Sequence, residues 1–223
     1  FFESADEIKE FAWSDLGQEM SDECAKSGVK CLDNMGGYYG ARDIMSQAPI
    51  TVPADMKNMK FRVPTTTMWV AMANAWGTNA TTVSFSEAYT ALSQGVCDSI
   101  ENPVPEMYTA SFHEVCKYLN LTHHMYAANG IIMNNAVFEG LDADMQELLV
   151  QKAKEFDEWT FEAVSAAEKE AVQAMADAGV TVNEDVDIEA FKAASESIYE
   201  TYQGWSEDLV DRCKAKLAEI RGE

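Results

Sequence analysis

The sequence has few basic residues and no long apolar run. Its 223 residues include 16 Lys and Arg against 38 Asp and Glu, which gives a formal net charge of −22 at pH 7. That charge repels a phosphate backbone, so the composition argues against a nucleic-acid-binding protein. The best apolar candidate, Met68 to Trp76, contains Asn74 and falls short of the about 20 residues that a membrane span needs. The chain is therefore not expected to span a membrane.

Zinc-binding and catalytic motifs are also missing. The cysteines have no CxxC spacing, which argues against a structural zinc site, and their odd number of five leaves at least one thiol unpaired within the chain. The sequence contains no Ser-His-Asp arrangement, Gly-rich phosphate loop or H-E-x-x-H motif. We expect Cys97 and Cys116 to be buried packing thiols rather than nucleophiles, because neither has an electropositive setting. Nothing in the sequence calls for a cofactor, a metal or catalysis.

The hydrophobic composition nevertheless indicates that the chain folds. Its residues are 47% hydrophobic and 10% aromatic, which excludes intrinsic disorder and suits one large or two small domains. Phe1 to Ser4 contain no basic region, apolar run or small-residue cleavage site. Either a signal peptide has been removed or the protein never had one.

Strands alternate with helices along the chain, which predicts an α/β fold. The capping-box pattern Ser84-Phe85-Ser86-Glu87 predicts the start of a helix that stops at Gly95. Gly36, Gly37 and Gly40 are expected to form a flexible crossing. Further helices are expected at residues 5–26, 67–76, 106–119, 188–202 and 209–220, and strands at 29–32, 60–63, 96–100, 124–134 and 180–182.

The clearest predicted element is a helix over residues 142–178. Apolar residues recur along it at helical spacing, and neither Gly nor Pro interrupts its 37 residues. Such a helix would be roughly 55 Å long and would bridge two lobes. The alternative, one arm of a coiled coil, fits less well because the stripe is rich in alanine and lacks repeated a/d leucines.

Arginine is scarce, and two of the four arginines stand apart. Arg212 and Arg221 belong to the charged face of the last helix, whereas Arg42 follows glycines and Arg62 lies in a short strand between apolar residues. A strand arginine faces solvent, pairs with a carboxylate or points into a cleft. A planar guanidinium can bind a ligand carboxylate through two parallel hydrogen bonds, in a binding protein or in an enzyme.

Among the histidines, His123 and His124 are adjacent on a predicted strand. Neighbouring strand residues point to opposite faces, so these two cannot easily share one metal ion. One of them is expected to line a cleft while the other is packed or exposed.

Four ordered motifs resemble those of the solute-binding receptors of TRAP transporters, the DctP-like family. After Pro49-Ile50, the stretch P-A-D-M-K-N-M-K-F-R-V-P (53–64) resembles P-x-D-[ML]-K-G-[LM]-K-[IL]-R-V-P, and S-F-S-E-A-Y-T-A-L-S-Q-G-V (84–96) resembles F-S-E-[VL]-Y-T-A-L-Q-Q-G-V. D-S-I-E-N-P (98–103) is similar to D-G-Q-E-N-P, and F-H-E-V-C-K-Y-L with T-H-H (112–124) to F-Y-E-V-Q-K-Y-L…T-x-H. The long helix also resembles the lobe-spanning helix of the family, so the match covers the whole chain.

The resemblance implies a two-lobe fold like that of periplasmic binding proteins. It implies a periplasmic receptor that closes around a small organic acid and delivers it to the membrane permease of a TRAP transporter. An oxidising periplasm would allow some of the cysteines to pair. The alternatives are a soluble enzyme acting on a carboxylic acid, with His124 as acid or base, and a sensor module that binds the same acids.

The resemblance also implies which residues bind the ligand. Arg62 matches the arginine that pairs with the ligand carboxylate, and Arg42 in Gly40-Ala41-Arg42 matches a second, upstream arginine. Asn102 would donate its amide to the same carboxylate, and Phe85 would line the cleft. Weaker candidates on the strand that varies with substrate are His124, Tyr126 and Asn129.

Three residues and the length depart from the family pattern. Asn58 replaces a glycine and Ser99-Ile100 replaces Gly-Gln, and both could alter the turn beside the arginine. Phe1 to Ser4 resemble a point well inside the family chain, so the N-terminal portion of lobe one is expected to be missing. Lobe one would consist of residues 1–39 and 128–167, and lobe two of residues 40–127 and 168–223.

Overall fold

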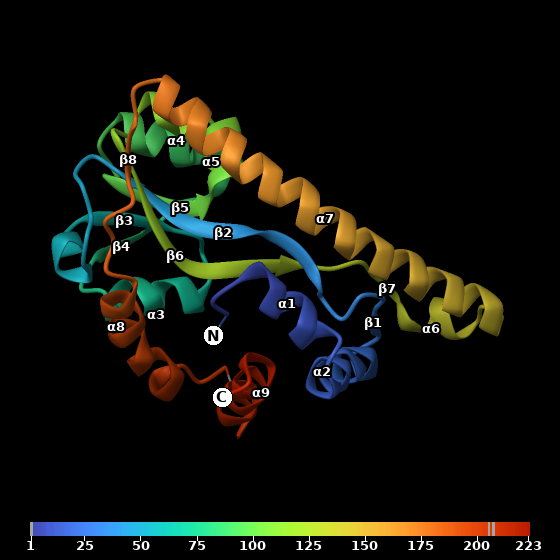
Figure 1. The fold of residues 1–223 in the computed structure, drawn as a ribbon. Coiled ribbons are helices and arrows are strands. Elements are labelled where there is room, and N and C mark those ends of the chain that lie inside the picture. The colour runs from blue at the N-terminus through green and yellow to red at the C-terminus, as the bar shows by residue number, and fades with distance from the viewer. Residues whose placement is uncertain (1, 205, 207) are drawn as a thin grey trace. The chain divides into compact units, whose positions relative to one another are not determined.

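The computed structural model describes residues 2–204, 206 and 208–223, and the chain separates into two compact units. Unit 1 contains Phe1–Gly40, Met125–Ala166 and Ser206–Glu223, and unit 2 contains Ala41–His124 and Ala167–Trp205. Strands β2 (Gly37–Ser46) and β6 (Tyr118–Asn129) and helix α7 (Ala143–Asp177) have residues in both units (Figure 1).

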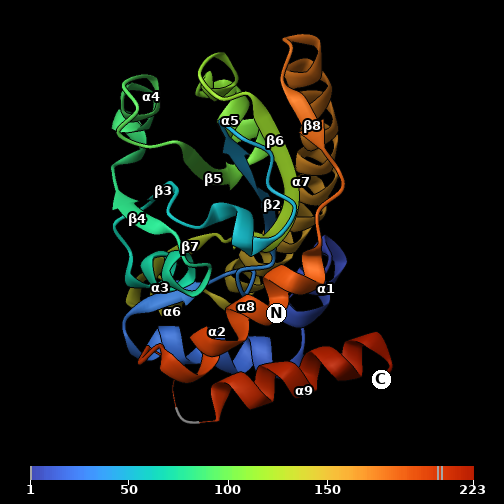
Figure 2. The ribbon, with the colours of Figure 1, turned by 90° about the vertical axis from the view of Figure 1, so that its left-hand side faces the viewer.

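A mixed sheet forms the centre of unit 2. Its strand order is β4-β3-β5-β2-β6-β8, with β3 parallel to both β4 and β5, β6 parallel to β8, and β2 antiparallel to β5. Figure 2 shows β8 beside β6. The α/β fold class is confirmed. The remaining strands of this sheet are β3 (Lys60–Val63), β4 (Asn79–Thr82), β5 (Ser99–Pro103) and β8 (Thr181–Asn183).

Helices pack on both faces of the sheet in unit 2 (Figures 1 and 2). On one face, helices α4, α5 and the second half of α7 enclose a core in which Met45, Ile100, Met107 and Met175 are fully buried. On the other face, Trp76 packs edge-on against Phe191, and helices α3 and α8 lie side by side. The bounds are α3 (Thr67–Ala75), α4 (Phe85–Ser93), α5 (Val104–Thr109) and α8 (Ile188–Thr201), with 3₁₀ turns at Pro53–Met56 and Phe112–Glu114.

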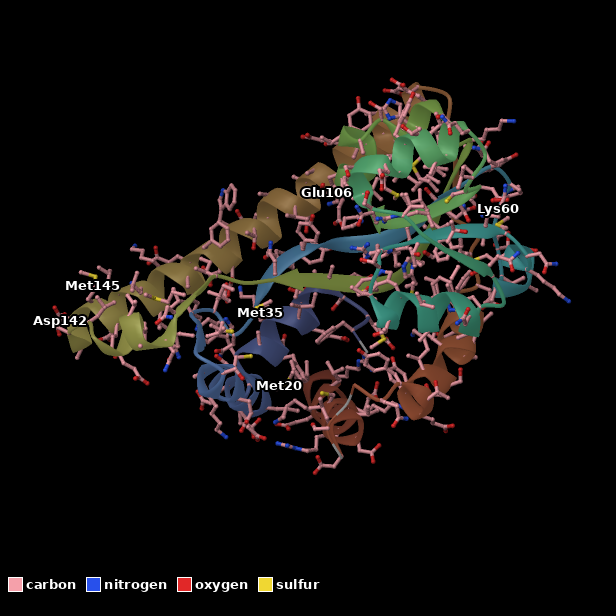
Figure 3. The ribbon with its side chains drawn as sticks, turned by 180° about the vertical axis from the view of Figure 1, so that it is seen from behind. Met20, Met35, Lys60, Glu106, Asp142 and Met145 are labelled. Atoms are coloured by element: carbon pink, nitrogen blue, oxygen red, sulfur yellow. The ribbon has the colours of Figure 1, made fainter. Side chains whose placement is uncertain are left out.

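Unit 1 combines a two-stranded antiparallel sheet with helices. Strand β1 (Val29–Cys31) pairs with β7 (Ile132–Asn134). Helix α9 packs on the first two helices, where Phe11 and Leu16 share a small core with Cys213 and Leu217. The side-chain view in Figure 3 labels Met20 in α2 and Met145 near the start of α7. The helices are α1 (Ala5–Ala12), α2 (Asp15–Lys26), α6 (Asn135–Glu139), α7 and α9 (Leu209–Arg221).

The long predicted helix is confirmed as α7, whose 35 residues run without interruption. The amphipathic helices α8 and α9 and the short strand at residues 60–63 are also confirmed. Cys97 and Cys116 are buried in the unit 2 core as free thiols, which agrees with the packing interpretation. Burial raises the pKa of Cys116 to about 12. Among the described residues, no helix is long and apolar enough to cross a bilayer.

Two predictions near the N-terminus were wrong. The expected helix 5–26 is divided at Trp13 and Ser14, because the Ser14 hydroxyl caps α2 by accepting a hydrogen bond from Gly17 N at 3.2 Å. The expected glycine crossing is instead the beginning of strand β2, which starts at Gly37. The glycines and charged residues of this segment give no strand pattern in the sequence. The strand is buried because neighbouring strands of the sheet surround it.

Two predictions around residues 96–119 also fail. The expected helix 106–119 ends at Thr109, because Ser111 adopts a left-handed conformation with φ of 59° and strand β6 begins at Tyr118. The expected strand 96–100 lies three residues later, at Ser99–Pro103.

The predicted capping box at Ser84 does not form as expected. Helix α4 starts where predicted, but the Ser84 hydroxyl donates to the Glu87 carboxylate at 2.5 Å instead of accepting from a backbone N–H. The Glu87 amide bonds to the Ser84 carbonyl oxygen at 3.2 Å.

The last helix belongs to a different unit from the one expected. Residues 168–223 were expected in lobe two, but Ser206–Glu223 belongs to unit 1. The reason is that α9 buries Cys213 and Leu217 against α1 and α2 and pairs Arg221 Nε with Glu7 Oε1 at 2.9 Å.

Candidate functional site

Arg62 is a buried cation held by strand β3 in unit 2. Only 3% of the residue is exposed, and its Nε donates to the carbonyl oxygen of Val83 at 2.9 Å. Within the described part of the chain, its two terminal nitrogens donate no hydrogen bond to another residue. Burial lowers the pKa of Arg62, although guanidinium groups stay charged in proteins. The site thus offers two parallel N–H donors on a desolvated cation.

Phe85, the first residue of α4, lies beside this guanidinium. The Cζ atom of Arg62 is 5.9 Å from the centre of the Phe85 ring, and that ring packs edge-on against the buried Phe112 at 5.7 Å. Phe85 remains 42% exposed. One aromatic face therefore supports Arg62 while part of the ring is available for an apolar contact.

Arg42 differs from Arg62 because a protein carboxylate already neutralises it. Its Nε and Nη2 donate to the two oxygens of Glu101 at 2.5 and 2.8 Å, and the Glu101 side chain is completely buried. The guanidinium also lies 5.4 Å from the centre of the Trp69 ring. Arg42 thus pairs with a protein carboxylate, which is one of the three alternatives that the sequence left open for a strand arginine.

His124 completes a buried polar group around Glu101. Its Nε2 lies 3.5 Å from Glu101 Oε2, its Nδ1 lies 2.7 Å from the hydroxyl of Thr122, and Trp76 packs edge-on against the ring. Burial raises the pKa of Glu101, but the hydrogen bonds and charges of His124 and Arg42 outweigh it and hold that pKa at about 2. Glu101 is therefore an anion that fixes both neighbours.

Strand register separates the predicted residues into two groups. Residues opposite each other on paired strands point to the same face of a sheet. Arg62 lies opposite Ile100 on β5, so Asn102, two residues further, shares its face. Arg42 lies opposite Pro103 and shares the other face with Glu101. Glu101 and Arg42 nevertheless lie near enough to alter the pKa of Arg62.

His123 faces a different acid from its neighbour, as expected for adjacent strand residues. Its backbone N–H donates to Asp43 Oδ1 at 2.8 Å, and its Nδ1 lies 3.1 Å from the same oxygen. Hydrogen bonding to Asp43 raises the pKa of His123 despite partial burial.

Tyr126 and Asn129 lie on the part of β6 that belongs to unit 1. Tyr126 is partly buried. Asn129 is also partly buried, and its side-chain oxygen is close to the backbone of Gly37. The other candidates, Arg42, Arg62, Phe85, Asn102 and His124, all belong to unit 2.

Neither Glu101 nor Trp69 was a candidate functional residue from the sequence. Glu101 was visible only as the acidic residue of the E-N-P motif, and its contact with Arg42 depends on the pairing of β2 with β5 across 59 residues. The described residues contain no group of three or more His, Cys, Asp or Glu side chains arranged to bind a metal ion.

Comparisons with known proteins match almost the whole chain. The family model of bacterial extracellular solute-binding protein family 7 (DctP) matches residues 1–204. The 2,3-diketo-L-gulonate-binding periplasmic protein YiaO of Escherichia coli is 34% identical over 182 residues, 80% of this chain and 54% of YiaO. The sialic acid-binding periplasmic protein SiaP of Vibrio cholerae is 29% identical over 198 residues, 88% of this chain and 61% of SiaP. The chain therefore spans little more than half the length of these curated relatives.

Solved structures show the same similarity in the fold. A TRAP periplasmic solute-binding protein from Actinobacillus succinogenes, crystallised with bound L-galactonate, matches with a TM-score of 0.86 and 31% identity. The match covers 98% of this chain and 72% of that protein.

Proposed function

Because the chain belongs to family 7 of the bacterial extracellular solute-binding proteins, we propose that it serves as the receptor of a TRAP transporter. It would bind a small organic acid in the periplasm and deliver it to the membrane permease subunits. The relatives named above are binding proteins whose names give sialic acid and 2,3-diketo-L-gulonate as ligands. The observation that carries the proposal is the desolvated guanidinium of Arg62, whose terminal donors have no partner among the described residues.

Arg62 would hold the ligand carboxylate. Its Nε bond to Val83 and the ring of Phe85 fix the orientation of the guanidinium, so little side-chain entropy is lost when an anion binds. Two parallel N–H···O bonds to one carboxylate are the strongest arrangement that such a group offers. The exposed part of Phe85 would contact the carbon skeleton of the acid.

Asn102 and Arg42 would act differently from each other. Asn102 shares the Arg62 face, where its amide N–H₂ can donate to the same carboxylate. Arg42 lies on the opposite face with Glu101, which already neutralises it, so it would act on Arg62 through its charge and would not contact the ligand itself. Glu101 and His124 would be positioning residues that hold Arg42. His124 fits this role better than acid/base catalysis, because only 1% of its side chain is exposed.

The test is a binding experiment with matched ligands and variants. A panel of small organic acids and their amides is screened by thermal shift, and affinities are then measured by isothermal titration. An acid is expected to raise the melting temperature and its amide is not. Arg62→Ala should weaken binding about 30-fold or more, because loss of a buried charge-assisted pair costs about 2 kcal/mol or more.

Arg212→Ala is the control, since it removes an arginine that pairs with Glu19 at the surface of unit 1. It should bind the acid like the unmodified chain. The proposal is wrong if Arg62→Ala retains the affinity, if amides bind as well as acids, or if no acid in the panel binds.

A further inference from the structure

Two buried carboxylates, Asp33 and Asp157, lie together in unit 1. Asp33 follows β1 and is fully buried, and Asp157, on α7, is 1% exposed. Burial and the neighbouring Asp33 raise the pKa of Asp157 to about 7. Lys9 lowers that pKa only weakly, and its ammonium group lies 3.6 Å from Glu158. Two like charges in a buried place require a proton or a cation between them.

Oxygen atoms without hydrogen-bond partners gather at this pair. Both carboxylate oxygens of Asp157 and the side-chain oxygen of Asn129 are buried and accept no hydrogen bond in the described part of the chain. The indole N–H of Trp13 is near enough to lower the pKa of Asp157. It forms no hydrogen bond with any described residue. Buried polar atoms are normally paired, so a cluster of unpaired acceptors indicates a ligand.

The backbone of glycine residues brings these oxygens close to one another. The position that a Cβ atom on Gly37 would take is 2.4 Å from Asn129 Oδ1 and 3.4 Å from Asp157 Oδ1. The corresponding position on Gly130 is 2.7 Å from Asp33 Oδ1. Any side chain at these glycines would collide with the oxygens. The side-chain oxygens of Asp33, Asp157 and Asn129 therefore lie directly against the backbone of Gly37 and Gly130.

Asp33 is oriented toward this site by two backbone N–H groups. Met35 N donates to Asp33 Oδ1 at 3.1 Å and Ile131 N donates to Oδ2 at 2.8 Å. Each oxygen keeps a second lone pair for another partner. Figure 3 labels Met35 in the loop that follows β1. The carboxylate is thus held in place before any ion binds.

We propose that Asp33, Asp157 and Asn129 bind one calcium ion within unit 1. The donors are all oxygens, the two carboxylates balance the charge of a divalent ion, and calcium accepts six to eight oxygen ligands in flexible geometry. Magnesium demands near-ideal octahedral geometry and keeps several water molecules, which suits three side chains held by the fold less well than the flexible coordination of calcium does. The ion would connect the loop after β1, the end of β6 and helix α7.

The test begins with the chain freed of divalent ions by a chelator, in 150 mM NaCl at pH 8. Calorimetric titration with calcium chloride should show one tight site per chain, and a calcium excess of 100 times the dissociation constant should raise the melting temperature by about 5 °C. Asp157→Asn should lose both effects. Asn is nearly isosteric and removes the repulsion between the carboxylates, so this variant should fold.

Asp144→Asn is the matched control, because Asp144 is an exposed aspartate on the same helix. It should respond to calcium like the unmodified chain. The calcium response should also shrink at pH 5, where a proton competes for Asp157.

Three results would overturn the proposal. If calcium has no effect at pH 8 while Asp157→Asn raises the melting temperature, the carboxylates share a proton instead. If Asp157→Asn binds calcium with the same stoichiometry and shift, the ion binds elsewhere. If magnesium at the same concentration has an equal effect, the response is a screening of surface charge.

Discussion

At the scale of single residues, the two buried arginines of unit 2 differ in what surrounds them. Arg42 forms a bidentate pair with Glu101, whereas Arg62 donates one hydrogen bond to a carbonyl oxygen and stacks near Phe85. The Arg42–Glu101 ion pair is complete within the protein and joins strands β2 and β5. Arg62 keeps a positive charge available for an external anion, so the two arginines should respond differently to substitution.

Removal of the Glu101 charge should destabilise unit 2. Glu101→Gln preserves the shape of the side chain but leaves Arg42 as a buried cation without its counterion. Loss of one member of a buried ion pair costs about 3 kcal/mol or more. Urea unfolding followed by tryptophan fluorescence measures the loss. Glu184→Gln, at an exposed position, is the control and should change stability by less than about 0.5 kcal/mol.

The same carboxylate should make stability depend on pH. The pKa of Glu101 is about 2 in the folded protein against 4.5 for an unperturbed glutamate, so the unfolded state binds the proton first. The stabilisation is complete above about pH 5 and is lost as the pH falls from 4.5 towards 2. Urea midpoints at pH 6, 5, 4 and 3 should fall more steeply for the unmodified chain than for Glu101→Gln. Parallel curves would contradict the assignment.

The residues of this site could be predicted only in part. The K-F-R-V-P motif identified Arg62 as a binding candidate, and its burial agrees with a place inside the protein. The partner of Arg42 was beyond prediction, because Glu101 reaches it only through the register of β2 with β5. The pairing of Asp157 with Asp33 was likewise beyond prediction, since only the folded chain brings the two carboxylates together.

At the scale of elements, helix capping in the structure differs from the motif in the sequence. Asp187 caps α8 by accepting a hydrogen bond from Ala190 N at 2.9 Å, whereas Ser84 forms no such bond at α4. Asp187→Ala should therefore destabilise the protein by about 1 kcal/mol, and Ser84→Ala by only a few tenths. Thermal and urea unfolding of both variants would show the contrast. Equal losses would contradict it.

Helix α7 should be sensitive to substitution on one side only. Met175 is fully buried in the unit 2 core, while Gln173 is exposed two residues earlier. Met175→Ala should cost about 2–5 kcal/mol, because it removes buried methylene groups and leaves a cavity. Gln173→Ala, the control on the same helix, should stay within about 0.5 kcal/mol. A similar loss for both variants, measured by urea unfolding, would argue against this packing.

Elements with a strong local signal were predicted well, and those that depend on neighbours were not. The uninterrupted apolar stripe gave α7 almost to the residue. Strand β2 was missed because its glycines and charged residues lack an alternating pattern, and its burial arises from β5 and β6 on either side. Helix α5 ends before Ser111, which adopts a left-handed conformation. Serine rarely adopts this conformation, so the sequence does not predict it.

At the scale of the whole molecule, the net charge should dominate the response to salt. The formal charge of −22 makes self-repulsion larger than the contribution of the surface ion pairs, each of which adds little. Raising sodium chloride from 20 to 500 mM screens that repulsion and should raise the melting temperature by several degrees. The measurement is made with a chelator present so that calcium plays no part. A fall in melting temperature would contradict this view.

The position of α9 has a consequence for the order of biosynthesis. A ribosome releases the N-terminus first, but Glu7 of α1 meets its ion-pair partner Arg221 only across 214 positions. Phe11 of α1 and Leu16 of α2 therefore stay uncovered until α9 has been made. The residues of unit 2 all precede α9 in the chain, so this unit can form earlier. During synthesis, α1 and α2 therefore reach their native contacts with α9 only after the residues of unit 2 have been made.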